Sequence, residues 1–278
     1  MNIGIVGLGL IGGSLAKAFK YADQTVYGMD KNPLTTEIAK MSEIIDDNLL
    51  NNLNKCDFVF IAVDANSTVE FVKEHAKDFN KNCIVIDCCG VKEAVCEPCF
   101  KVAKENGFCF IGGHPMAGTQ FSGLKNSKHD MFVGANMVLV PKKDEDLLIL
   151  QKVKDLLKKA GFSSVSITTA EKHDEIIAFT SQLAHVVSNA YVKSPNAKVH
   201  KGFSAGSYKD LTRVAWLNEE MWATLFMQNK ENISFEIENI IKELTKYNDA
   251  IKNNDYDTLK SLLKEGRECK ERCDKHDD

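Results

Sequence analysis

The sequence predicts an α/β protein with two parts, an N-terminal doubly wound parallel sheet and a C-terminal all-helical domain. Three observations carry this prediction. An apolar strand at residues 2–6 runs through a glycine turn into a helical pattern, apolar runs then alternate with helical stretches as far as residue 167, and only amphipathic helical patterns follow Thr168. Because 278 residues are about twice the length of a typical domain, we place two domains over 1–169 and 170–278.

The glycine turn Gly7-Leu8-Gly9-Leu10-Ile11-Gly12 has the spacing of a Rossmann-type dinucleotide site. Its first glycine permits the tight turn, the second lets the backbone approach a pyrophosphate, and the third allows close helix packing. The helix that starts there offers backbone N–H groups and a positive dipole end to the phosphates. We therefore assign the following residues to cofactor binding: Gly7, Gly9, Leu10, Ile11 and Gly12.

The strand over 25–29 indicates which cofactor binds. It ends at Asp30, where a carboxylate accepts hydrogen bonds from the adenosine ribose hydroxyls. Because Asp30 would repel the 2′-phosphate of NADP, we expect NAD. Val63, at the end of the apolar strand over 57–63, is a further candidate cofactor contact, since open α/β sheets bind ligands at the carboxyl ends of their strands.

The remaining elements continue this alternation. We expect further strands over 83–87, 108–112, 137–141 and 164–167, with helices near 67–79, 91–104 and 145–159. In the second domain, amphipathic patterns predict helices over about 170–193 and 218–230 and two or three more as far as residue 270. This helical domain is short, so we expect its apolar faces to be buried against a second copy in a homodimer.

Composition favours a globular protein without a nucleic-acid or membrane partner. Hydrophobic residues make up 44% and charged residues 27%, and the net charge of −4 includes no basic block. No apolar run is long enough to span a bilayer, and we expect a cytoplasmic location. The close cysteine pairs Cys96/Cys99 and Cys269/Cys273 lack a matching second pair or a histidine cluster, so we expect free thiols and no metal site.

Two polar residues mark a catalytic site. His114, in Gly113-His114-Pro115-Met116, lies at the carboxyl end of a predicted parallel strand, where ligands bind. An imidazole there can take a proton from a hydroxyl as a nicotinamide takes the hydride from the same carbon. Arg213, in the second domain, can clamp a carboxylate through a bidentate pair of hydrogen bonds.

These residues also carry a resemblance to the prephenate dehydrogenase family. It rests on the glycine turn with Asp30 and on three further segments, Gly112-Gly113-His114-Pro115-Met116-Ala117-Gly118-Thr119, Lys209-Asp210-Leu211-Thr212-Arg213-Val214-Ala215, and Met221-Trp222 with Asn229-Lys230-Glu231-Asn232. The resemblance spans nearly the whole chain. It implies NAD-dependent oxidative decarboxylation of prephenate to 4-hydroxyphenylpyruvate, with a Rossmann domain followed by a helical dimerisation domain.

The resemblance also implies residue roles. His114 would accept the proton of the ring 4-hydroxyl, Arg213 would bind a substrate carboxylate, and His185 would lie in the substrate pocket. Thr119 and Trp222 are further pocket candidates. If His114 acts as a neutral base, kcat should fall in acid with an apparent pKa within about a unit of the ordinary histidine value of about 6.5.

Two candidate pocket residues depart from the family pattern. Gly90 stands where several members have a serine, two residues before Lys92, so a hydroxyl that helps hold the substrate is missing. Gln120 stands where some members have a glutamate, which changes the local charge. Either difference bears on the choice between prephenate and its amino analogue, arogenate.

The other histidines are expected to lie on the surface. His75, His129, His200 and His276 lie in polar surroundings and are interpreted as surface residues, and His173 as part of a solvated helix face.

Two other functions stay open on the residues alone. A different two-domain NAD-dependent dehydrogenase, acting for example on 3-hydroxy acids, usually has a catalytic lysine motif that we do not find. A non-enzymatic nucleotide sensor would need the Rossmann half alone.

Overall fold

A computed structural model describes residues 1–119, 121–143 and 145–275 of the chain. Contacts divide the chain into two compact units, Met1–Asn229 and Lys230–Asp278. None of the helices in the described part of the chain is long and apolar enough to cross a membrane. The division of function near residue 169 stays a prediction.

The first unit is built on an eight-stranded sheet with the order β3-β2-β1-β4-β5-β6-β7-β8. The strands are β1 (Asn2–Val6), β2 (Thr25–Met29), β3 (Asp47–Asn48), β4 (Phe58–Ile61), β5 (Ile84–Asp87), β6 (Cys109–Pro115), β7 (Asn136–Val140) and β8 (Ser164–Ile167). All neighbours pair in parallel except β6 and β7, which are antiparallel. The sheet is therefore mostly, not wholly, parallel. The described residues between β6 and β7 form no α-helix, and antiparallel neighbours do not need a helical crossover.

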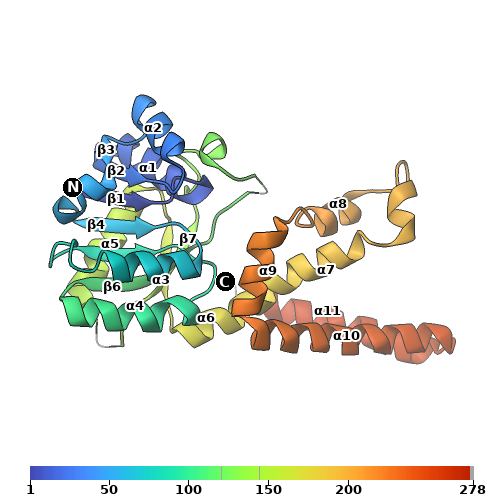
Figure 1. Cartoon of the computed structure of the whole chain (residues 1–278). Helices are drawn as coiled ribbons and strands as arrows, with labels where there is room; N and C mark the ends of the chain where they lie inside the picture. Colours follow the sequence, from blue (N-terminus) through green and yellow to red (C-terminus); the bar gives the residue numbers. More distant parts are fainter. Residues whose placement is uncertain (120, 144, 276–278) are drawn as a thin grey trace. The chain divides into compact units, whose positions relative to one another are not determined.

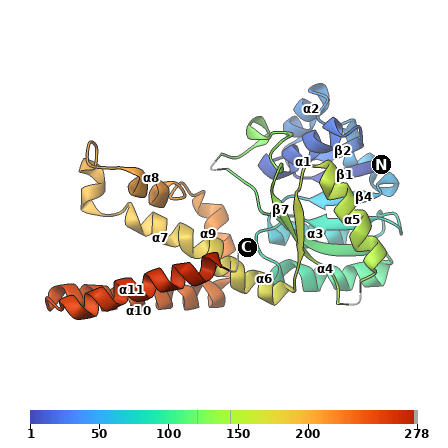
Figure 2. The same cartoon turned by 180° about the vertical axis from the view of Figure 1, so that it is seen from behind.

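Helices cover both faces of this sheet, as Figures 1 and 2 show from opposite sides. They are α1 (Leu10–Tyr21), α2 (Pro33–Met41), α3 (Ala65–Glu74), α4 (Glu93–Asn106) and α5 (Leu147–Lys159). One apolar core packs α1, α2 and α5 against the sheet, and the other packs α3 and α4 against its opposite face. The predicted doubly wound arrangement is confirmed.

Four further helices of the first unit follow β8: α6 (Ala170–Ile177), α7 (Ala184–Tyr191), α8 (Gly206–Thr212) and α9 (Glu219–Gln228). The predicted helix over 170–193 forms, but a π-helical segment over Ala178–Leu183 joins α6 to α7. Such wider turns are frequent at functional sites. Here the segment changes the helical register between His173 on α6 and His185 on α7.

The second unit is a pair of long helices, α10 (Lys230–Lys252) and α11 (Tyr256–Asp274). The hydroxyl of Tyr247 donates to the carbonyl of Leu262, 3.2 Å away, and so links the two helices. Several large apolar side chains of this unit are exposed: Phe235, Ile241, Leu244, Ile251, Tyr256 and Leu263. Exposed apolar side chains in this number are typical of a surface that binds another protein.

Candidate active site

The glycine turn is shaped by close backbone approach. Gly7 has φ +84°, and a Cβ there would lie 2.6 Å from the carbonyl oxygen of Ala62. A Cβ on Gly12 would lie 1.8 Å from the carbonyl oxygen of Gly7, so only glycine lets α1 start this close to the turn. Gly9 instead faces open space, with no atom within 4 Å of where its Cβ would be. The turn thus leaves room beside the second glycine, where a dinucleotide pyrophosphate binds.

The residues present fit NAD. No side chain caps the start of α1, and its first turn holds no acidic residue, so the N–H groups around Leu10 and Ile11 are suited to a phosphate. Asp30 lies directly beside the turn, because its carboxylate accepts the N–H groups of Leu8 and Asn32, each at 2.9 Å. Val63 also contacts the turn, since a Cβ on Gly7 would lie 2.6 Å from its side chain.

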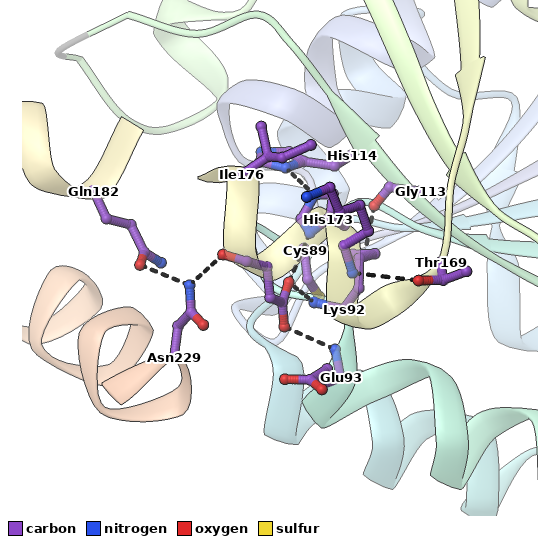
Figure 3. A network of polar contacts seen from close by, with 12 residues as sticks. Cys89, Lys92, Glu93, Gly113, His114, Thr169, His173, Ile176, Gln182 and Asn229 are labelled. Carbon is purple, nitrogen blue, oxygen red and sulfur yellow. Dashed lines mark hydrogen bonds and ion pairs between the residues drawn. The ribbon is translucent and has the colours of Figure 1, made fainter. Parts of the chain in front are cut away.

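His114 is the penultimate residue of β6 and forms a chain of hydrogen bonds with two residues of α6 (Figure 3). Its Nδ1 lies 2.9 Å from Nε2 of His173, and Nδ1 of His173 lies 2.6 Å from a carboxylate oxygen of Asp174. His173 and Asp174 are both buried. The expectation that His173 lies on a solvated helix face is therefore wrong, because α6 docks that face against the loop after β5 and against β6.

The hydrogen-bond chain from His114 through His173 to Asp174 determines which nitrogen of His114 carries the proton. The Asp174 carboxylate only accepts, so Nδ1–H of His173 donates to it and a neutral His173 has a lone pair on Nε2. Nδ1–H of His114 then donates to that lone pair, which leaves Nε2 of His114 as an acceptor. The arrangement prepares one nitrogen of His114 to take a proton from a ligand.

The pKa of His114 lies well below the ordinary histidine value. Burial is the main cause, and the neighbouring His173 imidazole and Lys92 ammonium act in the same direction. The acid limit of kcat is therefore expected on the lower side of 6.5, because the structure reveals a desolvation of His114 that the sequence did not. His114 stays neutral at neutral pH and well into the acid range.

A buried ion pair lies next to His114 and was missed by the sequence analysis. Lys92 contacts Asp87, the last residue of β5, and both side chains are wholly buried. Asp174 accepts the backbone N–H groups of Lys92 and Glu93 at 2.7 and 2.9 Å, and so caps the start of α4. The sequence signal was present: an acidic residue ends an apolar strand, and a lysine follows five residues later.

A second group of predicted residues lies on α7, α8 and α9. The rings of His185 and Trp222 lie with their centroids 4.0 Å apart, and Nδ1–H of His185 donates to the carbonyl of Ser181 at 2.8 Å. Burial lowers the pKa of His185, and the charge of Arg213 at the end of α8 adds to this effect. Among the described residues, no hydrogen bond or ring contact joins this group to His114.

Arg213 and Thr119 line one open cleft of about 570 Å³. Its other described lining residues are Gly118, Phe121, Lys125, Asn126, Ser127 and Lys128, so three cationic side chains and no carboxylate face it within the described residues. Gln120 lies outside the described residues. Gly90 lies beside α9, where an added Cβ would be 3.3 Å from the side chain of Leu225.

The other residues singled out in the sequence are the cysteines and the remaining histidines. All nine cysteines are free thiols. His129 is exposed as expected, whereas His75 and His200 are half-buried, and His276 lies outside the described residues. His75 packs on Phe71, with ring centroids 4.5 Å apart.

Comparison with known families and proteins finds the same match in both halves of the chain. Residues 15–166 match the family described as prephenate dehydrogenase, nucleotide-binding domain, and residues 169–265 match prephenate dehydrogenase, dimerization domain. The prephenate dehydrogenase of Lactococcus lactis is 29% identical over an alignment of 282 residues including gaps, and this alignment covers 98% of this chain and 77% of that protein.

Two solved structures are similar over almost the whole chain. The prephenate dehydrogenase from A. aeolicus, in complex with hydroxyphenyl propionate and NAD+, has a TM-score of 0.84 at 29% identity and covers 98% of each chain. The arogenate dehydrogenase of Synechocystis has a TM-score of 0.81 at 26% identity and covers 98% of this chain and 99% of its own.

Proposed function

Because this chain belongs to the prephenate dehydrogenase family, we propose that it oxidises prephenate with NAD, releasing CO2 and 4-hydroxyphenylpyruvate. The hydrogen-bond chain Asp174–His173–His114 carries the proposal, because it presents Nε2 of a neutral imidazole to a ligand. A neutral base of this kind is what removal of a hydroxyl proton requires. A nucleotide sensor has no need of such a base.

In the proposed reaction, Nε2 of His114 accepts the hydrogen bond and then the proton of the substrate's 4-hydroxyl. Nδ1–H of His114 continues to donate to His173, whose own Nδ1–H donates to Asp174. The carboxylate at the end of this chain fixes the tautomer of His173 that accepts Nδ1–H of His114. The imidazolium returns its proton to the same oxygen once the ring becomes aromatic.

NAD, when bound at the glycine turn, supplies the acceptor for the hydride that leaves the hydroxyl-bearing carbon. Loss of the ring carboxylate as CO2 leaves its electron pair in the ring. The product is then a phenol, and aromatisation makes the step effectively irreversible. The protein's task is to bind, orient and deprotonate the substrate.

The cationic cleft fits the charge of this substrate. Prephenate carries two carboxylates, and the cleft is lined by Arg213 with Lys125 and Lys128. We assign Arg213 to one carboxylate, because a guanidinium forms paired, charge-assisted hydrogen bonds with that group. His185 and Trp222, which lie together near Arg213, form an aromatic wall suited to the flat ring.

Arogenate is the second candidate substrate, since an arogenate dehydrogenase is among the similar structures. The two compounds differ only in a keto group or an amine on the side chain, and Gly90 and Gln120 are the departures that bear on this choice. Initial rates with NAD and each compound test the proposal. We expect a higher kcat/KM with prephenate; turnover of neither compound by folded, NAD-binding protein would refute the proposed function.

We also propose that the active protein is a homodimer. The matched dimerization family spans 169–265, and the helices of the second unit expose large apolar side chains such as Phe235, Leu244 and Leu263. Burial of this surface against a second copy would remove it from water.

A further inference from the structure

The ion pair between Lys92 and Asp87 has no part in the proton transfer described above. Both side chains are 0% exposed. Burying two charges is costly, and replacing a buried ion pair by apolar side chains often leaves stability unchanged or improves it. The pair therefore calls for an explanation other than stability, and its contacts supply one.

The pair holds both backbone groups of the residue that precedes His114. Nζ of Lys92 donates to the carbonyl of Gly113 at 2.6 Å, and the N–H of Gly113 donates to Asp87 at 3.0 Å (Figure 3). Gly113 has no space for a side chain, since a Cβ there would lie 2.4 Å from the carbonyl oxygen of Asp87. The end of β6 is thus clamped immediately before the imidazole.

Lys92 also contacts the far end of the hydrogen-bond chain, at Asp174. Its backbone N–H donates to Asp174 at 2.7 Å, on the same carboxylate oxygen that receives Nδ1–H of His173. One residue therefore holds the strand that carries His114 and the carboxylate that orients His173. Because these contacts come from different elements, the distance between the two imidazoles depends on Lys92.

We propose that Lys92, paired with Asp87, is a positioning residue that holds His114 against His173 and keeps its Nε2 unprotonated at working pH. The Lys92 ammonium binds the carbonyl of Gly113, which shares a peptide bond with the backbone nitrogen of His114. The Asp87 carboxylate binds the N–H of Gly113, which lies one residue further from His114. The positive end of the pair is thus the end toward His114. The catalytic part of this proposal rests on the proposed function.

The charged and titratable groups packed around His114 come from three places. Asp87 ends β5, Lys92 precedes α4, and His173 and Asp174 lie on α6. Lys92 is the charged group among them that opposes protonation of His114, in addition to burial and His173. Its own pKa is raised: burial lowers it, but the charge of Asp87 outweighs that effect. The ammonium is therefore present throughout the working pH range.

The test is a titration of the His114 ring by NMR in ligand-free protein, with the signal assigned by its loss in His114→Asn. The variant is Asp87→Asn/Lys92→Met, which removes both charges, because Lys92→Met alone leaves a buried, unpaired carboxylate. One close charge shifts a pKa by about 1–3 units, and loss of Asp87 offsets part of this, so we expect the midpoint to rise by roughly half a unit or more. The acid limit of kcat should rise with it.

Lys20→Met is the matched control, because Lys20 forms an exposed ion pair with Asp46 at the surface. It should leave the titration unchanged. If the double variant does not fold, Asp87→Asn/Lys92→Gln removes the same charges and retains an amide donor. A folded charge-free variant with an unmoved His114 midpoint would overturn the proposal and leave the pair a purely structural one. Since the NMR titration needs no turnover, it gives its answer even if the proposed reaction is not observed.

Discussion

His173 offers the sharpest test of the proton-accepting arrangement. Replacing it with phenylalanine retains an aromatic ring in a buried position but removes the nitrogen that accepts Nδ1–H of His114, 2.9 Å away. His114 then loses the partner that selects its tautomer. Its link to the Asp174 carboxylate through Nδ1 of His173 is also lost.

The expected effect follows from the lost control over the tautomer and orientation of His114. A positioned general base contributes about 10²–10⁴-fold in rate, and His173→Phe should lose part of this contribution. We therefore expect kcat of His173→Phe to fall roughly ten- to a hundredfold. KM for substrate and cofactor should change little, because the hydrogen bonds of His173 in the described part of the chain go to Thr169, Asp174 and His114, not to Arg213 or the glycine turn.

The pH profile supplies a second measure. Burial and the His173 imidazole both lower the pKa of His114, so His173→Phe removes part of the shift and raises that pKa. Because the neutral form is active, the acid limit of kcat should move to higher pH. Stopped-flow measurement of NADH absorbance between pH 4 and 8 follows both quantities. The control is His129→Phe, because His129 is an exposed histidine beside Tyr21. A folded His173→Phe protein with normal kcat and an unmoved acid limit would refute the role of the histidine chain.

Four further outcomes are expected. His114→Asn should lower kcat about 100-fold or more while NAD and substrate still bind, as titration calorimetry would measure; retention of most activity would identify another base. NAD should exceed NADP in kcat/KM by at least about tenfold, or roughly 1.4 kcal/mol, because of Asp30; equal rates, with Lys31 offsetting the repulsion, would contradict this. Arg213→Ala should raise substrate KM by about ten- to a hundredfold without changing NAD affinity, and steady-state kinetics would reveal an unaltered KM if Arg213 lay outside the site. Light scattering after size exclusion should give about twice the 31.0 kDa chain mass, whereas a fully active monomer would exclude the dimer.

The local features of the chain could be predicted from its sequence. The glycine turn, the strand before it and Asp30 lie close together in the chain, and their geometry follows from backbone conformation and short-range packing. His114 was recognised because the end of a strand is a position that the sequence pattern itself reveals. Alternation of strands and helices likewise predicted the doubly wound sheet, although it did not predict the reversed direction of β7.

The surroundings of His114 were decided by tertiary structure. The polar segment 171–175 is typical of a solvated helix face, yet His173 is buried because α6 docks beside the end of β6. Asp87 and Lys92 stand out in the sequence only as an acidic residue at a strand end and a lysine five residues later, and strand pairing brings both against Gly113. The sequence therefore indicated which residue we propose as the base. The tautomer, the pKa and the partners of that residue depend on burial and on contacts between residues up to 82 positions apart along the chain, which no local pattern specifies.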